Sequence, residues 1–142
     1  MLKKYFNYSP SKCDVIVVAG GDGFMLKTLK RYHKYQKSFY GINCGSYGFL
    51  LNRYNLKDLF KKINKSKQTI INPLMLTTKI KKKTKKIIAI NEISLFRQSK
   101  QTVSLSLRIG KKSIIKNLIG DGVLVSTPAG STAYNLSIDG PI

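Results

Sequence analysis

A carboxylate stands on a glycine-rich turn near the start of this chain, in the segment Gly-Gly-Asp-Gly at residues 20–23. The run before it, residues 15–19, is apolar and β-branched and predicts a buried strand, and the residues after it predict a helix. Backbone N–H groups on such a turn can approach phosphate closely, and the helix N-terminus adds partial positive charge. Asp22 itself would repel phosphate, so it is better suited to hold a metal or to accept a proton from an attacking hydroxyl. Phosphoryl transfer is therefore indicated, with a plain strand–helix turn capped by Asp22 as the alternative.

Two further polar clusters interrupt apolar runs. Asn91 and Glu92 lie within the apolar residues 87–96, where unpaired polar side chains are costly to bury. Their amide and carboxylate could bond to both hydroxyls of a ribose and to adenine, and a satisfied polar pair or a bulge is the alternative. Asp121 opens another buried run on a glycine turn, and residues 126–137 follow with many hydroxyl groups and a tyrosine. That stretch could line a nucleoside pocket with the tyrosine as an apolar wall, or be a polar loop without function.

The charge of the chain is extreme, with 26 basic residues, 6 acidic residues and a net charge of +20. Nucleic-acid binding is one explanation. We favour a compositional bias toward lysine, together with a surface that attracts nucleotides or polyphosphate, because the lysines are dispersed. Their one dense cluster, residues 81–86, predicts a solvated hairpin turn. Three of the six acidic residues lie beside Gly or Asn at the ends of apolar runs, which makes them functional candidates: Asp22, Glu92 and Asp121.

Other classes of function find little support in the sequence. No apolar run approaches the roughly 18 residues that span a bilayer, so no membrane partner is expected, and the N-terminus has no signal-peptide pattern. Cys13 and Cys44 need not pair, which favours a reduced, cytoplasmic setting. No His/Cys/Asp cluster has the spacing of a structural metal site, and His33 is expected on a solvated helix surface. The Walker A sequence is also absent.

Apolar patterning divides the chain into two parts. In the first part it predicts strands and helices in alternation, with a glycine-punctuated loop after the second strand: strands 14–19 and 38–43, helices 24–35 and 56–63, loop 41–50. This order indicates a parallel sheet, so residues 1–68 are predicted to form an α/β domain.

From residue 69 onward the pattern changes to strands. They are expected at 69–80, 87–96, 102–109, 113–119 and 122–126, before a short helix at 130–137. Gly110–Lys112 fits a hairpin turn between two of them. Residues 69–142 are therefore predicted to form a mainly-β domain. Both ends of the chain stop within expected structure and leave sheet edges open, so a fragment of a longer protein, incomplete at the C-terminus, is expected.

Four motifs occur in a fixed order along the chain. They are Gly-Gly-Asp-Gly from Gly20, Gly-Ile-Asn-x-Gly-x-x-Gly-Phe-Leu from Gly41, Asn-Glu at Asn91, and Asp-Gly-x-x-x-Ser-Thr-Pro-x-Gly-Ser-Thr-Ala-Tyr-x-Leu-Ser from Asp121. Together they resemble NAD kinases, which use ATP or polyphosphate to convert NAD into NADP. The first motif is shared with diacylglycerol and sphingosine kinases, whereas the last is far more specific. The resemblance implies an α/β domain of the NAD kinase and diacylglycerol kinase type, followed by a β-sandwich domain.

The resemblance also implies roles for individual residues. Asp22 would be the general base that accepts the proton of the 2′-hydroxyl on the adenosine ribose of NAD, and Asp22 and Gly23 would both contact NAD. Gly20, Gly21 and Gly23 would lie near the phosphates of the donor, with Mg²⁺ or another divalent cation neutralising their charge. Further NAD contacts are implied at Asn91, Glu92, Asp121, Thr132, Ala133, Tyr134, Asn135, Leu136 and Ser137. A homodimer or homotetramer that shares the NAD site between subunits is implied as well.

The chain departs from the family pattern in a few places. The usual N-terminal strand and helix and much of the C-terminal sandwich are missing, and Ala129 replaces a commoner threonine. A lipid kinase with the same Gly-Gly-Asp-Gly turn is the alternative enzyme, although the Asn91–Glu92 pair and residues 132–137 argue against it. A non-catalytic basic protein that binds nucleic acid is the alternative from a different class.

Overall fold

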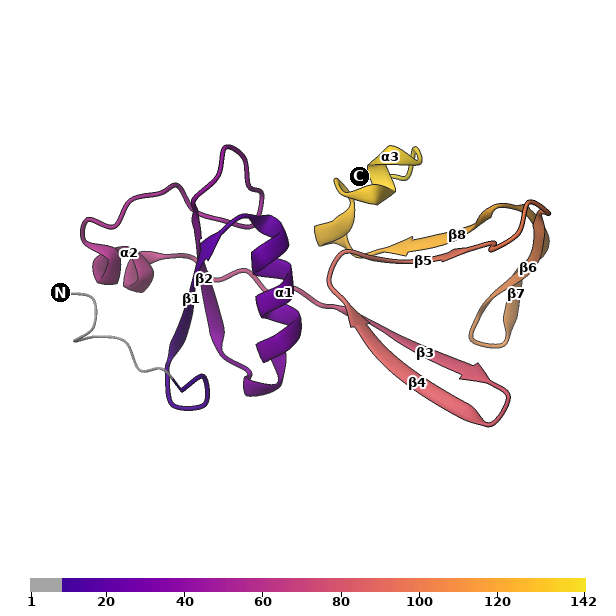
Figure 1. Cartoon of the computed structure of the whole chain (residues 1–142), viewed down its shortest axis with the longest axis horizontal. Coiled ribbons are helices and arrows are strands. Elements are labelled where there is room, and N and C mark those ends of the chain that lie inside the picture. Colours follow the sequence, from indigo (N-terminus) through magenta and orange to yellow (C-terminus); the bar gives the residue numbers. More distant parts are fainter. Residues whose placement is uncertain (1–8) are drawn as a thin grey trace. The chain divides into compact units, whose positions relative to one another are not determined.

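The computed structural model describes residues 9–142, which divide into two compact units (Figure 1). The first unit ends at Ile70, and the second runs from Ile71 to Ile142. The boundary expected from the sequence was two residues earlier, after residue 68. The expected order, an α/β part followed by a mainly-β part, is confirmed. Among the helices of residues 9–142, none combines the length and the apolar character that a bilayer crossing requires.

A parallel pair of strands forms the centre of the first unit. β1 (Val15–Gly20) pairs in parallel with β2 (Ser38–Asn43), and the last residues of the two strands lie opposite each other. The crossover between them is α1 (Asp22–Tyr32), continued by a short 3-10 helix, η2 (His33–Tyr35), and Figure 1 shows α1 alongside both strands. A parallel pair requires a crossover of this kind. The strand–helix–strand unit predicted from the sequence is therefore confirmed.

The apolar core of the first unit is small. Val18 from β1, Met25 from α1 and Ile42 from β2 are almost fully buried. Gly41 belongs to the same core, because a Cβ atom at this position would stand 2.3 Å from Leu51 Cδ2 and 2.7 Å from Met25 Cε. The absence of a side chain at Gly41 thus lets the helix and the segment after β2 close on the sheet.

Both longer helices of this unit begin at positions other than those expected. α1 begins at Asp22 and not at residue 24, because Gly21 before it is extended, with φ −104° and ψ 176°. α2 (Leu59–Lys65) begins later than the expected residue 56. Asp58 explains the delay, since its left-handed backbone (φ 53°) interrupts the right-handed helical path.

Three antiparallel strand pairs make up the second unit. They are β3 (Leu74–Ile80) with β4 (Lys83–Ala89), β6 (Val103–Ile109) with β7 (Lys112–Gly120), and β5 (Glu92–Phe96) with β8 (Gly122–Ser126). The hairpin predicted at Gly110 is confirmed, and the φ of Gly110 is 57°, a conformation that tight hairpin turns favour in glycine. The β5–β8 pair instead joins segments far apart in the sequence.

Some expected elements of the second unit are wrong in detail. Residues 87–96 form two strands and not one, because the backbone of Ile90 and Asn91 turns away to bond with Thr127. Only Lys81 and Lys82 of the lysine cluster form a turn, and the others belong to β4. The expected helix at 130–137 is split into η3 (Pro128–Gly130) and α3 (Tyr134–Ser137), because Ala133 between them has a non-helical backbone.

We predict that Gly41→Ala lowers the free energy of unfolding by about 1–3 kcal/mol, because the added methyl group overfills the core of the first unit. Gly45→Ala is the matched control, since its nearest atom would be Asn43 Oδ1 at an ordinary 3.6 Å. Urea unfolding followed by circular dichroism measures both. Equal stability of the two variants would contradict this account of the core.

Candidate active site

The Gly-Gly-Asp-Gly turn leaves its backbone open. Gly21 and Gly23 have no atom within 4 Å of the place where a Cβ would stand, beyond their immediate chain neighbours. Gly20 lies closer to α1, with its Cβ position 3.0 Å from the ring of Phe24. A ligand can therefore approach the turn from the side of Gly21 and Gly23, at the N-terminal end of the 11-residue helix α1.

Asp22 stands in the first turn of α1, and its carboxylate bonds to a distant loop. Oδ2 accepts the backbone N–H of Phe49 at 2.8 Å, and Oδ1 accepts that of Leu50 at 3.1 Å. The N-cap position belongs to Gly21, which makes no side-chain cap bond. The alternative prediction, in which Asp22 caps a plain strand–helix turn, is therefore wrong. An ionised carboxylate has about four acceptor sites, so two remain for a further donor such as a hydroxyl.

The loop that supplies these N–H groups is tied to the ends of both strands. Cys44 N donates to Gly20 O at 3.0 Å, which links the loop to the glycine turn. Farther along, Asn52 donates to Gly41 O from its backbone and from its side chain, both at 3.0 Å, and its own carbonyl accepts Asn43 N at 2.8 Å. Residues 44–51 thus form a loop whose two ends are both hydrogen-bonded to the sheet or to the glycine turn.

Asn91 and Glu92 carry the strongest indication of a ligand in the second unit. Within residues 9–142, Asn91 Oδ1 and Glu92 Oε2 are buried side-chain oxygens that have no hydrogen-bond partner. Buried acceptors without partners are costly, and natural structures leave few of them. The satisfied polar pair considered from the sequence is therefore not what the structure contains, and a donor-bearing ligand would compensate both atoms.

The backbone at Asn91 is held by the hydroxyl-rich segment after β8. Thr127 is 4% exposed, donates its hydroxyl to Ile90 O at 2.6 Å, and donates its backbone N–H to Asn91 O at 2.8 Å. Gly130 N donates a hydrogen bond to the Thr127 hydroxyl oxygen at 3.1 Å. A Cβ atom on Gly130 would stand 2.3 Å from Asn91 O, so glycine allows this close approach. Sequence reasoning placed Thr127 and Gly130 in a stretch that could line a nucleoside pocket, but it did not assign either residue this role of holding the backbone at Asn91.

Asp121 lies at the other end of the β5–β8 pair from Glu92. The register places Glu92 opposite Ser126 and Phe96 opposite Gly122, so Asp121 and Glu92 are about 17 Å apart along the strands. Asp121 Oδ1 accepts a hydrogen bond from Arg97 Nε at 2.5 Å, the one ion pair found within residues 9–142.

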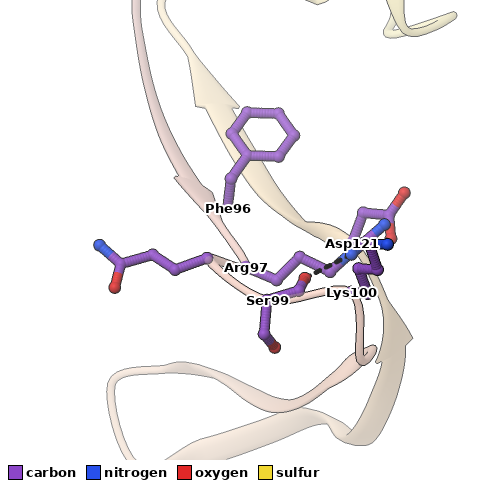
Figure 2. A pocket seen from close by; sticks show the side chains of 6 residues that line it. Phe96, Arg97, Ser99, Lys100 and Asp121 are labelled. Carbon is purple, nitrogen blue, oxygen red and sulfur yellow. Dashed lines mark hydrogen bonds and ion pairs between the residues drawn. The ribbon is translucent and has the colours of Figure 1, made fainter.

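The Arg97–Asp121 ion pair borders an open cavity of about 390 Å³, where Figure 2 shows the two side chains facing each other. Arg97 also donates its backbone N–H to Asp121 O at 2.9 Å and a guanidinium N–H to Ser99 O. Arg97 was not assigned a role from the sequence, because its partner becomes visible only with the strand register.

The remaining predicted contacts lie in and before α3. Tyr134 is 44% exposed, and its ring tilts against Phe96 with centroids 6.1 Å apart. Asn135 is buried, and its Nδ2 donates to Ser131 O at 3.3 Å and to Pro141 O at 2.8 Å, which fixes the fold of this segment. Most of the other residues predicted here are exposed and available for contacts, with Ala133 partly buried: Thr132, Ala133, Leu136 and Ser137.

Side chains that commonly bind metal ions do not cluster in the part of the chain that the structure describes. Residues 9–142 contain no group of three or more His, Cys, Asp or Glu side chains that could hold a metal ion. Asp22 directs both of its oxygens to backbone N–H groups. Cys13 and Cys44 are both free thiols.

The structure thus combines an α/β unit that carries a carboxylate on its glycine turn with a following β unit that contains unpaired buried acceptors. Comparison with protein families identifies the class of protein. Residues 2–72 match the ATP-NAD kinase N-terminal domain, and residues 90–142 match the ATP-NAD kinase C-terminal domain. The chain therefore belongs to the NAD kinase family. The match of both domains decides against the lipid-kinase alternative.

Individual relatives agree with this assignment. The chain is 48% identical to the NAD kinase of Rhizobium meliloti over 139 residues and 44% identical to that of Caulobacter vibrioides over 140 residues. These matches cover 97% and 98% of this chain but 54% of each relative, so the chain spans about half their length. Among solved structures, yeast NADH kinase complexed with NADH matches with a TM-score of 0.81 at 29% identity, over 92% of this chain and 40% of that one.

We predict that Thr127→Val destabilises the second unit by about 1–3 kcal/mol, because Ile90 O loses its buried hydroxyl donor. Thr127→Ser keeps the hydroxyl and should cost roughly 1 kcal/mol, the value of one buried methyl group. Chemical denaturation measures the difference. A valine variant as stable as the serine variant would show that the hydroxyl does not hold this segment.

Proposed function

We propose that this protein is an NAD kinase, which transfers the γ-phosphoryl group of ATP to the 2′-hydroxyl of the adenosine ribose of NAD and so makes NADP. The observation that carries the proposal is the pair of buried, unpartnered oxygens on Asn91 and Glu92. Ribose hydroxyls and the adenine amino group are donors of the kind that these acceptors lack. The names of the relatives, NAD kinase and NADH kinase, support the same substrate class.

Asp22 is the proposed general base. As the ribose 2′-oxygen forms its bond to the γ-phosphorus, the bond from that phosphorus to the bridging oxygen breaks, ADP leaves, and Asp22 takes the hydroxyl proton. A positioned base of this kind is worth about 10²–10⁴ in rate. The two acceptor sites that the loop N–H groups leave open on Asp22 suit this step.

The other site residues bind and orient the two substrates. The open backbone of Gly21 and Gly23, together with the adjacent Gly20, receives the donor phosphates. Asn91 and Glu92 hold the ribose and adenine of NAD. Residues 132–137 line the adenine side, with the exposed face of Tyr134 as an apolar wall. Asp121 contacts the nicotinamide half of NAD.

The setting of the reaction is part of the proposal. A bound Mg²⁺ or another divalent cation would neutralise charge on the donor phosphates. Polyphosphate shares the phosphoanhydride chemistry of ATP and is the second donor to test. The roughly 17 Å between Asp121 and Glu92 along one strand pair fits a homo-oligomer in which subunits share the NAD site. Two free thiols agree with a reducing, cytoplasmic location.

We predict that the full-length gene product forms NADP from NAD, ATP and Mg²⁺, and that Asp22→Asn lowers kcat at least about a hundredfold, because the amide cannot accept the proton. Asp58→Asn is the control, since it makes the same change of charge at another residue of the first unit. An enzyme-coupled assay of NADP measures both. If neither ATP nor polyphosphate yields NADP, the proposed function is wrong.

We predict that Glu92→Gln raises KM for NAD about tenfold to a hundredfold, because a bond to a charged acceptor contributes about 1.5–3 kcal/mol. Asp139→Asn should leave KM unchanged. It makes the same change of charge at an exposed residue whose φ of 57° suits asparagine. Initial rates over a range of NAD concentrations separate the two variants. An unchanged KM in Glu92→Gln would remove this residue from the NAD site.

A further inference from the structure

The loop at residues 44–51 donates two backbone N–H groups to the carboxylate of Asp22. We infer that Gly48, with the backbone N–H groups of Phe49 and Leu50, positions the Asp22 carboxylate for proton transfer. The inference rests on the proposed function, because it assigns a positioning device to the same general base. Neither Phe49 nor Leu50 needs its side chain for this task, and the Phe49 ring is 84% exposed.

Two donors fix the carboxylate more firmly than one. Phe49 N donates to Oδ2 at 2.8 Å and Leu50 N donates to Oδ1 at 3.1 Å, so adjacent backbone groups engage both oxygens. A single donor would leave the carboxylate free to rotate about its Cβ–Cγ bond. With both bonds in place, the unused acceptor sites of Asp22 keep one direction, which is what a base needs in order to meet a hydroxyl at about 2.6–3.2 Å.

The two donors are themselves held by the sheet. The loop begins at Cys44, which bonds to the carbonyl of Gly20 next to the glycine turn. It ends at Asn52, which bridges to Ile42 in β2. Because both ends are attached to strand residues, a displacement inside the loop is transmitted to Asp22 and is not absorbed by the loop as a whole.

Gly48 is the residue of this loop that lies against the carboxylate. A Cβ at Gly48 would stand 3.2 Å from Asp22 Oδ1, 3.3 Å from Leu51 Cδ1 and 3.4 Å from Asn43 Cγ. Such contacts are tight, so alanine requires a shift of a few tenths of an ångström among these neighbours. The backbone of Gly48 lies outside the left-handed region, so steric contact, and not backbone strain, is the reason for glycine here.

Gly45 provides a matched comparison in the same loop. Its Cβ position has one neighbour within 4 Å, Asn43 Oδ1, at an ordinary 3.6 Å, and the bond from Gly45 N to that oxygen does not depend on the side chain. Gly48→Ala and Gly45→Ala therefore make the same chemical change on the same segment, and they differ in whether the new methyl group meets Asp22.

The test measures kcat and KM for NAD in the full-length gene product carrying each substitution. We expect Gly48→Ala to lower kcat about tenfold or more with KM within about twofold, because a misplacement near 1 Å can cost about 10² in rate. Gly45→Ala should keep both constants within about twofold. In the Asp22→Asn background, Gly48→Ala should cost nothing further, because its effect passes through the carboxylate. Equal losses in both backgrounds, or equal losses from the two alanine variants, would overturn the inference.

A double-mutant cycle on the free energy of unfolding tests the inference without an activity assay. The cost of Gly48→Ala to the free energy of unfolding should be smaller in the Asp22→Ala background, where the oxygen at 3.2 Å is gone. If Gly48→Ala alone does not fold, the double variant should recover folding. An identical cost in both backgrounds would refute the contact. A wild-type protein that makes no NADP would instead refute the proposed function.

Discussion

The parallel pairing of β1 with β2 is the constraint on which the first unit depends. Its register sets Gly20 opposite Asn43, so the turn that follows one strand and the loop that follows the other leave the sheet at the same edge. Only there can backbone N–H groups from the loop meet the Asp22 carboxylate. The buried side chains of Val18 and Ile42 hold the two strands in this register, because a slip would expose them. A small apolar core thus determines where the Asp22 carboxylate points.

In the second unit, the candidate site residues are also held by hydrogen bonds, but the roles of side chain and backbone are exchanged. In the first unit, backbone donors orient a side chain, whereas in the second unit a side chain orients the backbone. The Thr127 hydroxyl and the missing Cβ of Gly130 draw the chain at Asn91 against the segment after β8. The amide of Asn91 and the carboxylate of Glu92 are left without internal partners as a result.

Local patterns predicted more of this protein than nonlocal ones. The strand, turn and helix around Asp22 follow from adjacent residue types, so the sequence indicates them well. The break between β4 and β5 was indicated only by the polar pair Asn91–Glu92, for which a bulge was one alternative, because its cause, the bond from Thr127 to Ile90 O, comes from far along the chain. The ion pair of Arg97 with Asp121 was invisible for the same reason, since it depends on the β5–β8 register. Candidate residues were found by motif, whereas the groups that position them required the fold.

The ion pair of Arg97 with Asp121 has a wider consequence, because it is the one such pair found in the described part of a chain with a net charge of +20. The cationic side chains of this protein must rely on water and dissolved counter-ions for compensation. Mutual repulsion among them opposes compactness most in dilute buffer, where the Debye length is about 30 Å at 0.01 M, and fades at physiological ionic strength, where it is about 8 Å. A net positive charge of this size also raises the local concentration of phosphorylated anions near the surface before any specific contact forms.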